Sequence, residues 1–200
     1  MTKKDMKNIL LLLAEGFECY EAGAFIDVIG WNLVDGDKST QLFSCGLRPE
    51  IKSSFNQRIL VDYLVDEIDV EAFDALVVIG GFNEYNYYKD AYDERFLSLI
   101  RSFNSRSKII SSVCVGALPI ARSGALISRR ATTCNLGDKK LEELRSYEVN
   151  VLNEQIVTDH NISTSCNTST AVDVALLLLE RLTSKEQSNL IREMMGFNLK

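Results

Sequence analysis

The stretch Lys108-Ile-Ile-Ser-Ser-Val-Cys-Val-Gly-Ala-Leu-Pro-Ile-Ala-Arg-Ser-Gly124 decides the fold of this chain. Ile109 to Val113 has the short apolar pattern of a buried strand, and Gly116 to Arg122 has the pattern of a helix that ends at Gly124. Cys114 lies at the corner between them. A strand that turns at once into a helix lifts the corner side chain above the sheet edge and aims free N–H groups at whatever reacts there. The stretch therefore predicts a nucleophile elbow with Cys114 at its corner.

A cysteine at such a corner has two interpretations. The dipole of the following helix favours a thiolate, so the first is a reactive nucleophile with a lowered pKa. The second is a buried structural cysteine, because free cysteines are among the most buried residues. This stretch by itself does not decide between the two.

The bulk composition is that of one soluble globular domain, which we expect to span residues 1–200, with 46% hydrophobic and 25% charged residues. No apolar run approaches the ~20 residues that cross a membrane, and the run from Ile9 to Ala14 is too short for a signal peptide. We therefore expect a cytoplasmic protein with no membrane contact. A net charge of −6 without a cluster of Lys or Arg argues against nucleic acid as a partner.

The cysteine content points to a reducing compartment. Five cysteines are scattered along the chain and form no C-x-x-C motif. This pattern favours free thiols over a disulfide framework or a zinc site. The sequence implies no metal and no organic cofactor.

Outward from the elbow, apolar strands alternate with helices. Further strands or extended segments are predicted at Asn8 to Ala14, Thr40 to Cys45, Gly46 to Asp66 (a hairpin or short edge strands), Asp74 to Ile79, Ala131 to Cys134 and Gln155 to Ser165 (two runs around a turn). Helices are predicted at Tyr20 to Val34, Asp93 to Asn104, Asp138 to Ser146, Thr168 to Leu182 and Ser184 to Met195, and a loop at Phe82 to Tyr88. In the first helix, one apolar face is formed by Ala22, Phe25, Ile26, Ile29 and Leu33. The alternation predicts an open, mostly parallel α/β sheet with helices on both faces.

Three segments follow the carboxyl ends of predicted strands, where such folds bind ligands. They are the turn from Glu15 to Glu21, the pair Gly80-Gly81, and the corner at Cys114. The two glycines let a backbone N–H approach a ligand closely, or they simply form a tight turn. Because these segments are distant in sequence yet meet at one sheet edge, we expect a site there.

Attack of a cysteine on a carbonyl-like carbon needs a thiolate, donors for the developing oxyanion and a group that handles a proton. Cys114 supplies the thiolate, and the N–H groups of Val115 and Gly81 supply the donors. The usual proton carrier is histidine, but the chain has only His160, in a predicted turn. We interpret His160 as a solvated turn residue.

The remaining proton carriers are Glu18 and Glu21, of which Glu21 is better placed at the start of the first helix. An ionised carboxylate beside Cys114 opposes thiolate formation, whereas a protonated Glu21 in a partly apolar pocket donates a hydrogen bond to the thiolate. We prefer the protonated form. The alternative is that Glu21 is merely a carboxylate favoured in a first helical turn by the macrodipole.

Four stretches together resemble the ThiJ/PfpI family of the class I glutamine-amidotransferase-like superfamily. They are Ala14-Glu-Gly-Phe-Glu-Cys-Tyr-Glu21, Asp74-Ala-Leu-Val-Val-Ile-Gly-Gly81, Ser112-Val-Cys-Val-Gly-Ala117 and Arg130-Ala-Thr-Thr133. The resemblance implies a flavodoxin-like three-layer sandwich and a homodimer. It also implies that Cys114 is the elbow nucleophile, Glu21 its acidic partner, and Gly81 and Val115 the oxyanion donors.

The chain departs from the family pattern at Cys134, because many members carry histidine directly after the Ala-Thr-Thr stretch. Without an imidazole that shuttles protons near neutral pH, a Cys-His mechanism such as a peptidase or a glutaminase is disfavoured. The resemblance still implies Cys-Glu chemistry: glyoxalase-type conversion of 2-oxoaldehydes, deglycation, or isocyanide hydration. Cys134 is either a small apolar filler, which we favour, or a thiol that resolves an oxidised Cys114 as a disulfide if the sulfurs are close.

We therefore expect a cysteine-dependent hydrolase or lyase that acts on a small electrophilic molecule through Cys114 and Glu21. The alternative is a redox-sensing or stress-response member of the family with little turnover. A protease, amidase or amidotransferase-like activity is a weaker alternative, since no histidine is suitably placed.

Overall fold

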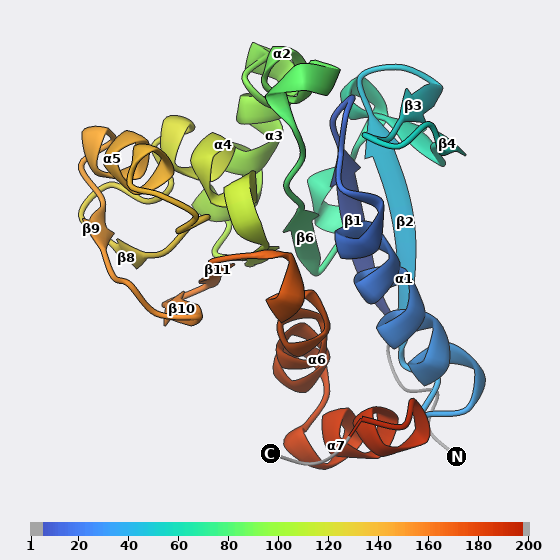
Figure 1. Ribbon diagram of the computed structural model, residues 1–200. Helices are drawn as coiled ribbons and strands as arrows, with labels where there is room; N and C mark the ends of the chain where they lie inside the picture. Colours follow the sequence, from blue (N-terminus) through green and yellow to red (C-terminus); the bar gives the residue numbers. More distant parts are fainter. Residues whose placement is uncertain (1–5, 198–200) are drawn as a thin grey trace.

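The computed structural model describes residues 6–197 and builds them around one seven-stranded sheet (Figure 1). The strand order is β10-β11-β7-β6-β1-β2-β5, and all neighbours are parallel except the antiparallel pair β10 and β11. The strands of this sheet are β1 (Lys7–Leu13), β2 (Thr40–Gly46), β5 (Tyr63–Leu64), β6 (Ala75–Val78), β7 (Ile109–Ser112), β10 (Ile156–Asp159) and β11 (Ile162–Ser165). Two small sheets pair β3 (Glu50–Lys52) with β4 (Arg58–Leu60) and β8 (Arg130–Ala131) with β9 (Asn150–Val151).

The central strand β1 shows why two layers of helices are needed. It lies between β2 and β6, with Leu10 opposite Phe43 on one side and Leu76 on the other. Successive side chains of a strand point to opposite faces, so an unbroken apolar strand must be covered twice. Leu10 and Leu12 accordingly belong to one buried cluster, while Ile9 belongs to another. Each fully buried side chain of this kind contributes about 1.5–3 kcal/mol to folding.

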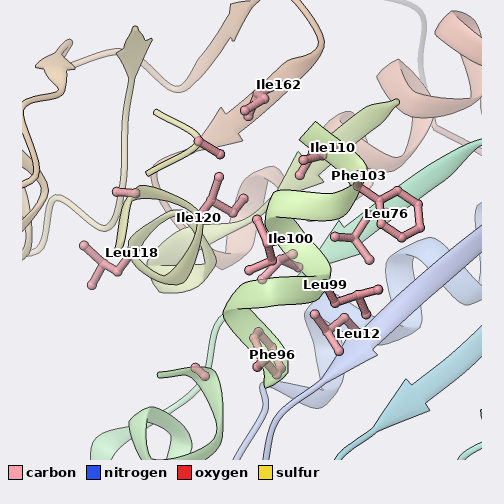
Figure 2. Packing of buried hydrophobic residues seen from close by; sticks show 14 of the residues in the cluster. Leu12, Leu76, Phe96, Leu99, Ile100, Phe103, Ile110, Leu118, Ile120 and Ile162 are labelled. Atoms are coloured by element: carbon pink, nitrogen blue, oxygen red, sulfur yellow. The ribbon is translucent and has the colours of Figure 1, made fainter. Parts of the chain in front are cut away.

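The helices divide between these two clusters. One face is covered by α1 (Cys19–Val34), α6 (Ala171–Leu182) and α7 (Lys185–Met194). The other is covered by α2 (Tyr87–Ala91), α3 (Glu94–Ser105), α4 (Ala117–Arg122) and α5 (Lys139–Ser146). Figure 2 shows the second cluster, in which Phe96, Ile100 and Phe103 of α3 lie beside Leu12 and Leu76 of the sheet. The flavodoxin-like three-layer sandwich expected from the sequence is confirmed.

The predicted buried face of α1 was wrong at two positions. Ile26 is 41% exposed and Leu33 is 37% exposed, although both were expected in the core. The buried face instead includes Val28 and Asn32. Asn32 is tolerated there because its amide donates to Thr40 Oγ1 at 2.8 Å, so the buried polar group has a partner.

The segment predicted as a loop from Phe82 to Tyr88 is largely helical. It forms a 3₁₀ turn at Asn83–Tyr85 and then enters α2. The reason is Tyr87, which is fully buried and donates from its hydroxyl to Ile79 O at 2.6 Å, so the chain must turn back over the end of β6. Among the described residues, no helix combines the length and apolar character that crossing a membrane requires.

Candidate active site

The elbow after β7 holds Cys114 in a strained conformation. Its φ is +53°, in the left-handed region that non-glycine residues rarely adopt. Gly116 keeps the turn pressed against β6, because a Cβ at this position would stand 2.3 Å from Val78 O. The hydroxyl of Thr133 donates to Cys114 O at 3.0 Å and fixes the corner from the other side. Strain that the surroundings hold in this way is typical of functional sites.

The helix after the corner agrees with the predicted span Gly116 to Arg122 to within one residue. Cys114–Gly116 forms a 3₁₀ turn, and the α-helix begins only at Ala117 and ends at Arg122. The macrodipole of such a short helix is a weak source of thiolate stabilisation. The N–H of Val115 nevertheless hydrogen-bonds to the Cys114 sulfur, as expected for the first free donor of the elbow.

Glu21 projects from the first turn of α1 to the end of β6. Its side chain is 1% exposed, and Oε2 accepts a hydrogen bond from Gly80 N at 2.7 Å. Thr168 Oγ1 donates to Oε1 at 2.8 Å. Burial raises the pKa of Glu21 from 4.5 to about 7, although the hydrogen bonds from Thr168 and Gly80 act in the opposite direction. At neutral pH this carboxyl can therefore both give and take a proton.

Gly80 lies close to both the Glu21 carboxyl group and the Cys114 side chain. A Cβ on Gly80 would lie 3.0 Å from Glu21 Oε2 and 3.2 Å from Cys114 Cβ. The Glu21 carboxyl and the Cys114 side chain therefore both approach the position where Gly80 lacks a side chain. Gly81 is needed for a second close approach, because a Cβ there would stand 2.3 Å from Gly16 O.

Backbone pairing at Gly81 leaves its N–H out of the bridge to Phe17. The bridge between Phe17 and Gly81 is made by Glu18 N to Gly80 O at 2.9 Å and by Phe82 N to Gly16 O at 3.0 Å. Neither bond uses the Gly81 N–H. Gly81 and Val115 line the same pocket as Cys114.

The pocket has a volume of about 330 Å³, which suits a small organic molecule. Its lining includes Glu21, Cys114 and Cys134. The other lining residues are Glu18, Gly81, Phe82, Asn83, Glu84, Tyr88, Val115, Leu136, Lys140, Asn167 and Thr168. Burial raises the pKa of Glu18 as well.

Cys134 lies in direct interaction with Cys114. The Cys114 thiol hydrogen-bonds to the Cys134 sulfur, and this contact lowers the pKa of Cys134 to about 6. The N–H of Leu136 and the ammonium of Lys140 act in the same direction. The same hydrogen bond, burial and the neighbouring Glu21 carboxyl raise the pKa of Cys114. The pKa of Cys114 is therefore raised, and not lowered as the helix dipole alone predicts, whereas the pKa of Cys134 is lowered.

His160, which the sequence analysis interpreted as a solvated turn residue, lies far from the pocket. His160 is in the turn between β10 and β11, where its side chain is 79% exposed. β11 pairs with β7 from Ile110 onward, so His160 lies at the amino ends of these strands, opposite Cys114.

Sequence reasoning missed Thr168, whose signal was its position directly after the carboxyl end of β11. It also missed Tyr88 and Lys140, for which the sequence carries no signal, because only the packing of α2 beside α5 joins them.

The profile of the DJ-1/PfpI family matches residues 7–181. Among individual proteins, the chain is 25% identical over 186 residues to "Protein DJ-1 homolog A" of Arabidopsis thaliana, covering 92% of this chain and 45% of that protein. It is 28% identical over 124 residues to "Isonitrile hydratase" of Pseudomonas putida, covering 62% of this chain and 52% of that protein. The chain thus spans less than half of the Arabidopsis relative.

The fold is also that of solved structures. The crystal structure of Drosophila melanogaster DJ-1beta superposes with a TM-score of 0.84, covering 97% of this chain and 100% of that chain, at 23% sequence identity. The agreement extends over nearly the whole described sheet and both helical layers.

Proposed function

Because this chain belongs to the DJ-1/PfpI family, we propose that it is a cysteine-dependent enzyme that converts small 2-oxoaldehydes into 2-hydroxy acids. The observation that carries the proposal is the contact at Gly80, where a carboxyl with a pKa of about 7 adjoins the strained elbow cysteine. Isomerising a 2-oxoaldehyde moves a proton from one carbon to its neighbour. A group that exchanges a proton in both directions at neutral pH is suited to that step.

The first step is addition of sulfur to the aldehyde. Cys114 bonds to the carbonyl carbon and passes its proton to the thiolate of Cys134, which already accepts its hydrogen bond. The electron pair of the C=O bond moves to oxygen. The N–H groups of Gly81 and Val115 line the pocket beside the sulfur and stabilise the resulting negative charge.

The second step uses Glu21 as an acid and a base. The oxyanion first takes back the proton held by Cys134. The Glu21 carboxylate then removes the proton from the carbon bonded to sulfur, giving an enediolate, and returns it to the adjacent carbon while the hydroxyl proton passes to the neighbouring oxygen. The product of this transfer is a thioester of a 2-hydroxy acid on Cys114. Water then attacks the thioester carbon, the C–S bond breaks, and the acid leaves while sulfur recovers its proton.

Isocyanide hydration is the second candidate, and the similarity to the Pseudomonas putida isonitrile hydratase favours it. In this reaction sulfur adds to the terminal isocyanide carbon, the carbon gains a proton from Glu21, and water displaces sulfur to release an N-substituted formamide. The pocket volume of about 330 Å³ admits both substrate classes.

The test is a product assay with the purified chain. Methylglyoxal and phenylglyoxal are supplied as 2-oxoaldehydes, and cyclohexyl isocyanide as the alternative substrate, with product identified by chromatography. We expect 2-hydroxy acid formation that falls at least ~10³-fold in Cys114→Ala. Cys19→Ser, in which the cysteine lies outside the pocket, is the matched control and should retain activity. Formamide formation alone would replace the first candidate by the second, and loss of neither activity in Cys114→Ala would overturn both.

We also propose the homodimer and the cytoplasmic location expected from the sequence. Supporting a dimer, α1 presents a groove lined by the exposed side chains of Ile26, Trp31 and Val34. Supporting a reducing compartment, all five cysteines are free thiols. Light scattering of the purified chain at several concentrations tests the dimer, and a monomer at all of them would contradict it.

A further inference from the structure

We propose that Cys114 and Cys134 close into a reversible disulfide and that, through this cycle, the protein reduces small hydroperoxides at the expense of an external thiol. The proposal rests on the same Cys114 sulfur as the proposed function but requires no turnover of a carbonyl compound. It assigns a second activity to the site, and it gives Cys134 the role of resolving thiol.

The position of the two sulfurs is the first support. Of the five cysteines, all of which the structure describes, only Cys114 and Cys134 line the pocket. Their side chains already touch through a hydrogen bond. The hydroxyl of Thr133 holds the chain next to the elbow by donating to Cys114 O at 3.0 Å. Cys134 itself belongs to no helix or strand, so closing an S–S bond of about 2.05 Å breaks no pairing at that residue.

The surroundings of Cys134 are the second support. Its sulfur accepts the N–H of Leu136 and lies in the field of the Lys140 ammonium, both of which stabilise negative charge. A small apolar filler would need neither contact. In addition, Cys134 is partly open to solvent, whereas Cys45 is fully buried and its thiol has a strongly raised pKa. The arrangement is that of a reactive thiol pair.

The chemistry balances with a hydroperoxide as oxidant and a thiol as reductant. Cys114 sulfur attacks the terminal oxygen, the O–O bond breaks, and Cys134 takes the Cys114 proton. The products are a sulfenic acid on Cys114 and an alkoxide, which receives a proton from neutral Glu21. Cys134 sulfur then bonds to the sulfenic sulfur, and its proton leaves with the hydroxide as water. Two equivalents of external thiol reduce the disulfide and restore both thiols.

The experiment follows the two cysteines in the whole protein. The reduced protein is treated with equimolar cumene hydroperoxide, blocked with N-ethylmaleimide in denaturant and analysed without reduction. Trypsin cleavage after Lys108, Arg122, Arg130 and Lys139 puts the two cysteines into separate peptides, residues 109–122 and 131–139. We expect these peptides to be joined, and the intact protein to have the mass of a monomer less two hydrogens plus three N-ethylmaleimide adducts. Cumyl alcohol should form catalytically when dithiothreitol is present.

Two variants separate the proposal from its rivals. In Cys134→Ser the cross-link should disappear, Cys114 should accumulate one and then two oxygen atoms, and peroxide turnover should fall at least ~10-fold. In Cys166→Ser, which removes a buried cysteine outside the pocket, the cross-link should persist. A wild-type protein whose Cys114 becomes a sulfinic acid while Cys134 is still alkylated would overturn the proposal, as would a cross-link that requires Cys166.

The two proposals fail in different ways. Turnover of methylglyoxal without any joined peptide overturns only the disulfide cycle. A joined peptide and cumyl alcohol without turnover of any carbonyl compound or isocyanide overturn only the function proposed above. A Cys114 that reacts with neither class of substrate overturns both.

Discussion

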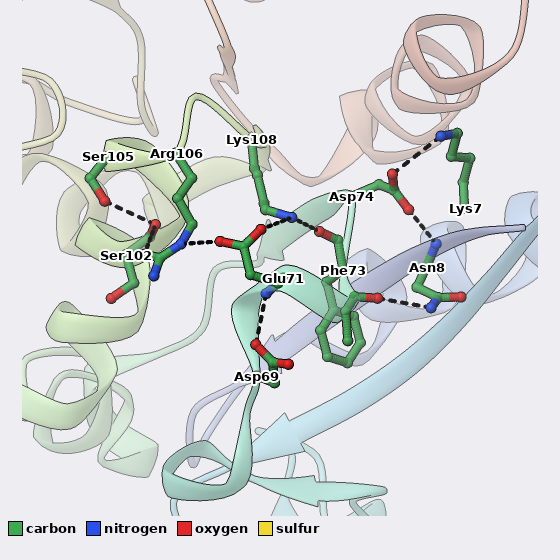
Figure 3. Close-up of polar contacts among 11 residues, drawn as sticks. Lys7, Asn8, Asp69, Glu71, Phe73, Asp74, Ser102, Ser105, Arg106 and Lys108 are labelled. Carbon is green, nitrogen blue, oxygen red and sulfur yellow. Dashed lines mark hydrogen bonds and ion pairs between the residues drawn. The ribbon is translucent and has the colours of Figure 1, made fainter. Parts of the chain in front are cut away.

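The two ends of the central sheet carry opposite kinds of polar cluster. At the carboxyl ends of β6 and β7, the side chain of Glu21 is buried and Cys114 is strained. At the amino ends, charged side chains are solvated and paired with opposite charges, as Figure 3 shows. Lys7 faces Asp74 at 3.4 Å, with side chains 39% and 34% exposed.

The amino-end cluster joins loops to the sheet. Arg106 Nε lies 2.6 Å from Glu71 Oε1, and Lys108 Nζ lies 3.8 Å from Glu71 Oε2. Asp74 also accepts from Asn8 N at 2.9 Å (Figure 3). Exposed ion pairs of this kind contribute about 0–1 kcal/mol each, because water solvates both partners when they separate.

The comparison shows that burial, and not the number of charges, shifts the pKa of a carboxyl group. Glu71 meets two cations in water, whereas Glu21 meets no cation and is shielded from water. Its charged form is therefore disfavoured, and its pKa moves to neutrality. The following predictions test this difference, from the largest expected effect to the smallest.

Glu21→Gln should abolish proton transfer while preserving the shape of the site, since an amide oxygen can still accept from Gly80 N. We expect carbonyl turnover to fall about 10²–10⁴-fold, the usual contribution of a general acid–base group. Initial rates with methylglyoxal measure the effect. Retained turnover in Glu21→Gln would assign the proton transfer to another group.

The same substitution should change the pH dependence of stability. Because the pKa of Glu21 rises from 4.5 to about 7 on folding, the folded state holds a proton that the unfolded state has lost between these values. Wild-type stability should therefore fall by about 3 kcal/mol as pH rises through this window, and Glu21→Gln should remove this loss. Urea unfolding at pH 5 and pH 8 measures it. Equal pH slopes in both proteins would show that the buried carboxyl ionises freely.

Cys134→Ser should separate the two thiols of the active end. In the wild-type protein, iodoacetamide should alkylate the peptide of Cys134 with an apparent pKa of about 6, because its thiolate accepts from Cys114. Carbonyl turnover in the variant should fall about 10²-fold, since the proton acceptor is lost. Peptide mass spectrometry across pH checks the alkylation. First alkylation at Cys114 instead would reverse our assignment of the thiolate.

Thr168→Val should have a smaller effect on the same end. The hydroxyl of Thr168 lowers the pKa of Glu21, so its loss should move that pKa upward. We expect a few-fold change in turnover and a shift of the pH–rate profile to higher pH. Thr170→Val, which changes a neighbouring hydroxyl that bonds to Asn167 O, is the matched control and should leave the profile in place.

Glu71→Gln at the opposite end should have the smallest effect. It removes the charge that faces Arg106 and Lys108, but the Glu71 side chain is 67% exposed. We expect a loss of less than about 1 kcal/mol in unfolding free energy and no change in turnover. A larger loss would mean that the ion pairs at the amino end contribute more to the free energy of unfolding than solvent-exposed ion pairs usually do.

Much of the fold could be predicted from the sequence because short segments carry the residue patterns of the strands and helices that they form. The apolar run at β1, the helical spacing in α3 and the stop at Gly124 each specify an element without knowledge of its neighbours. Gly124 has a φ of +90°, as a helix stop requires. The errors at Ile26, Leu33 and Tyr87 arose where the choice of face or turn depends on which element packs there.

The sequence alone determined most of the order of strands and helices along the chain, and it predicted that Glu21, Gly81 and Cys114 meet at one edge of the sheet. These results depend on the spacing of apolar residues along the chain, which can be seen in the sequence itself. Only the tertiary structure decided that Cys134 interacts with Cys114, that Thr168 bonds to Glu21 and that the pKa of Cys134 is lowered while that of Cys114 is raised. The reason is physical: a pKa is set by burial and by neighbours within a few ångströms, and those are products of packing between segments distant in the chain.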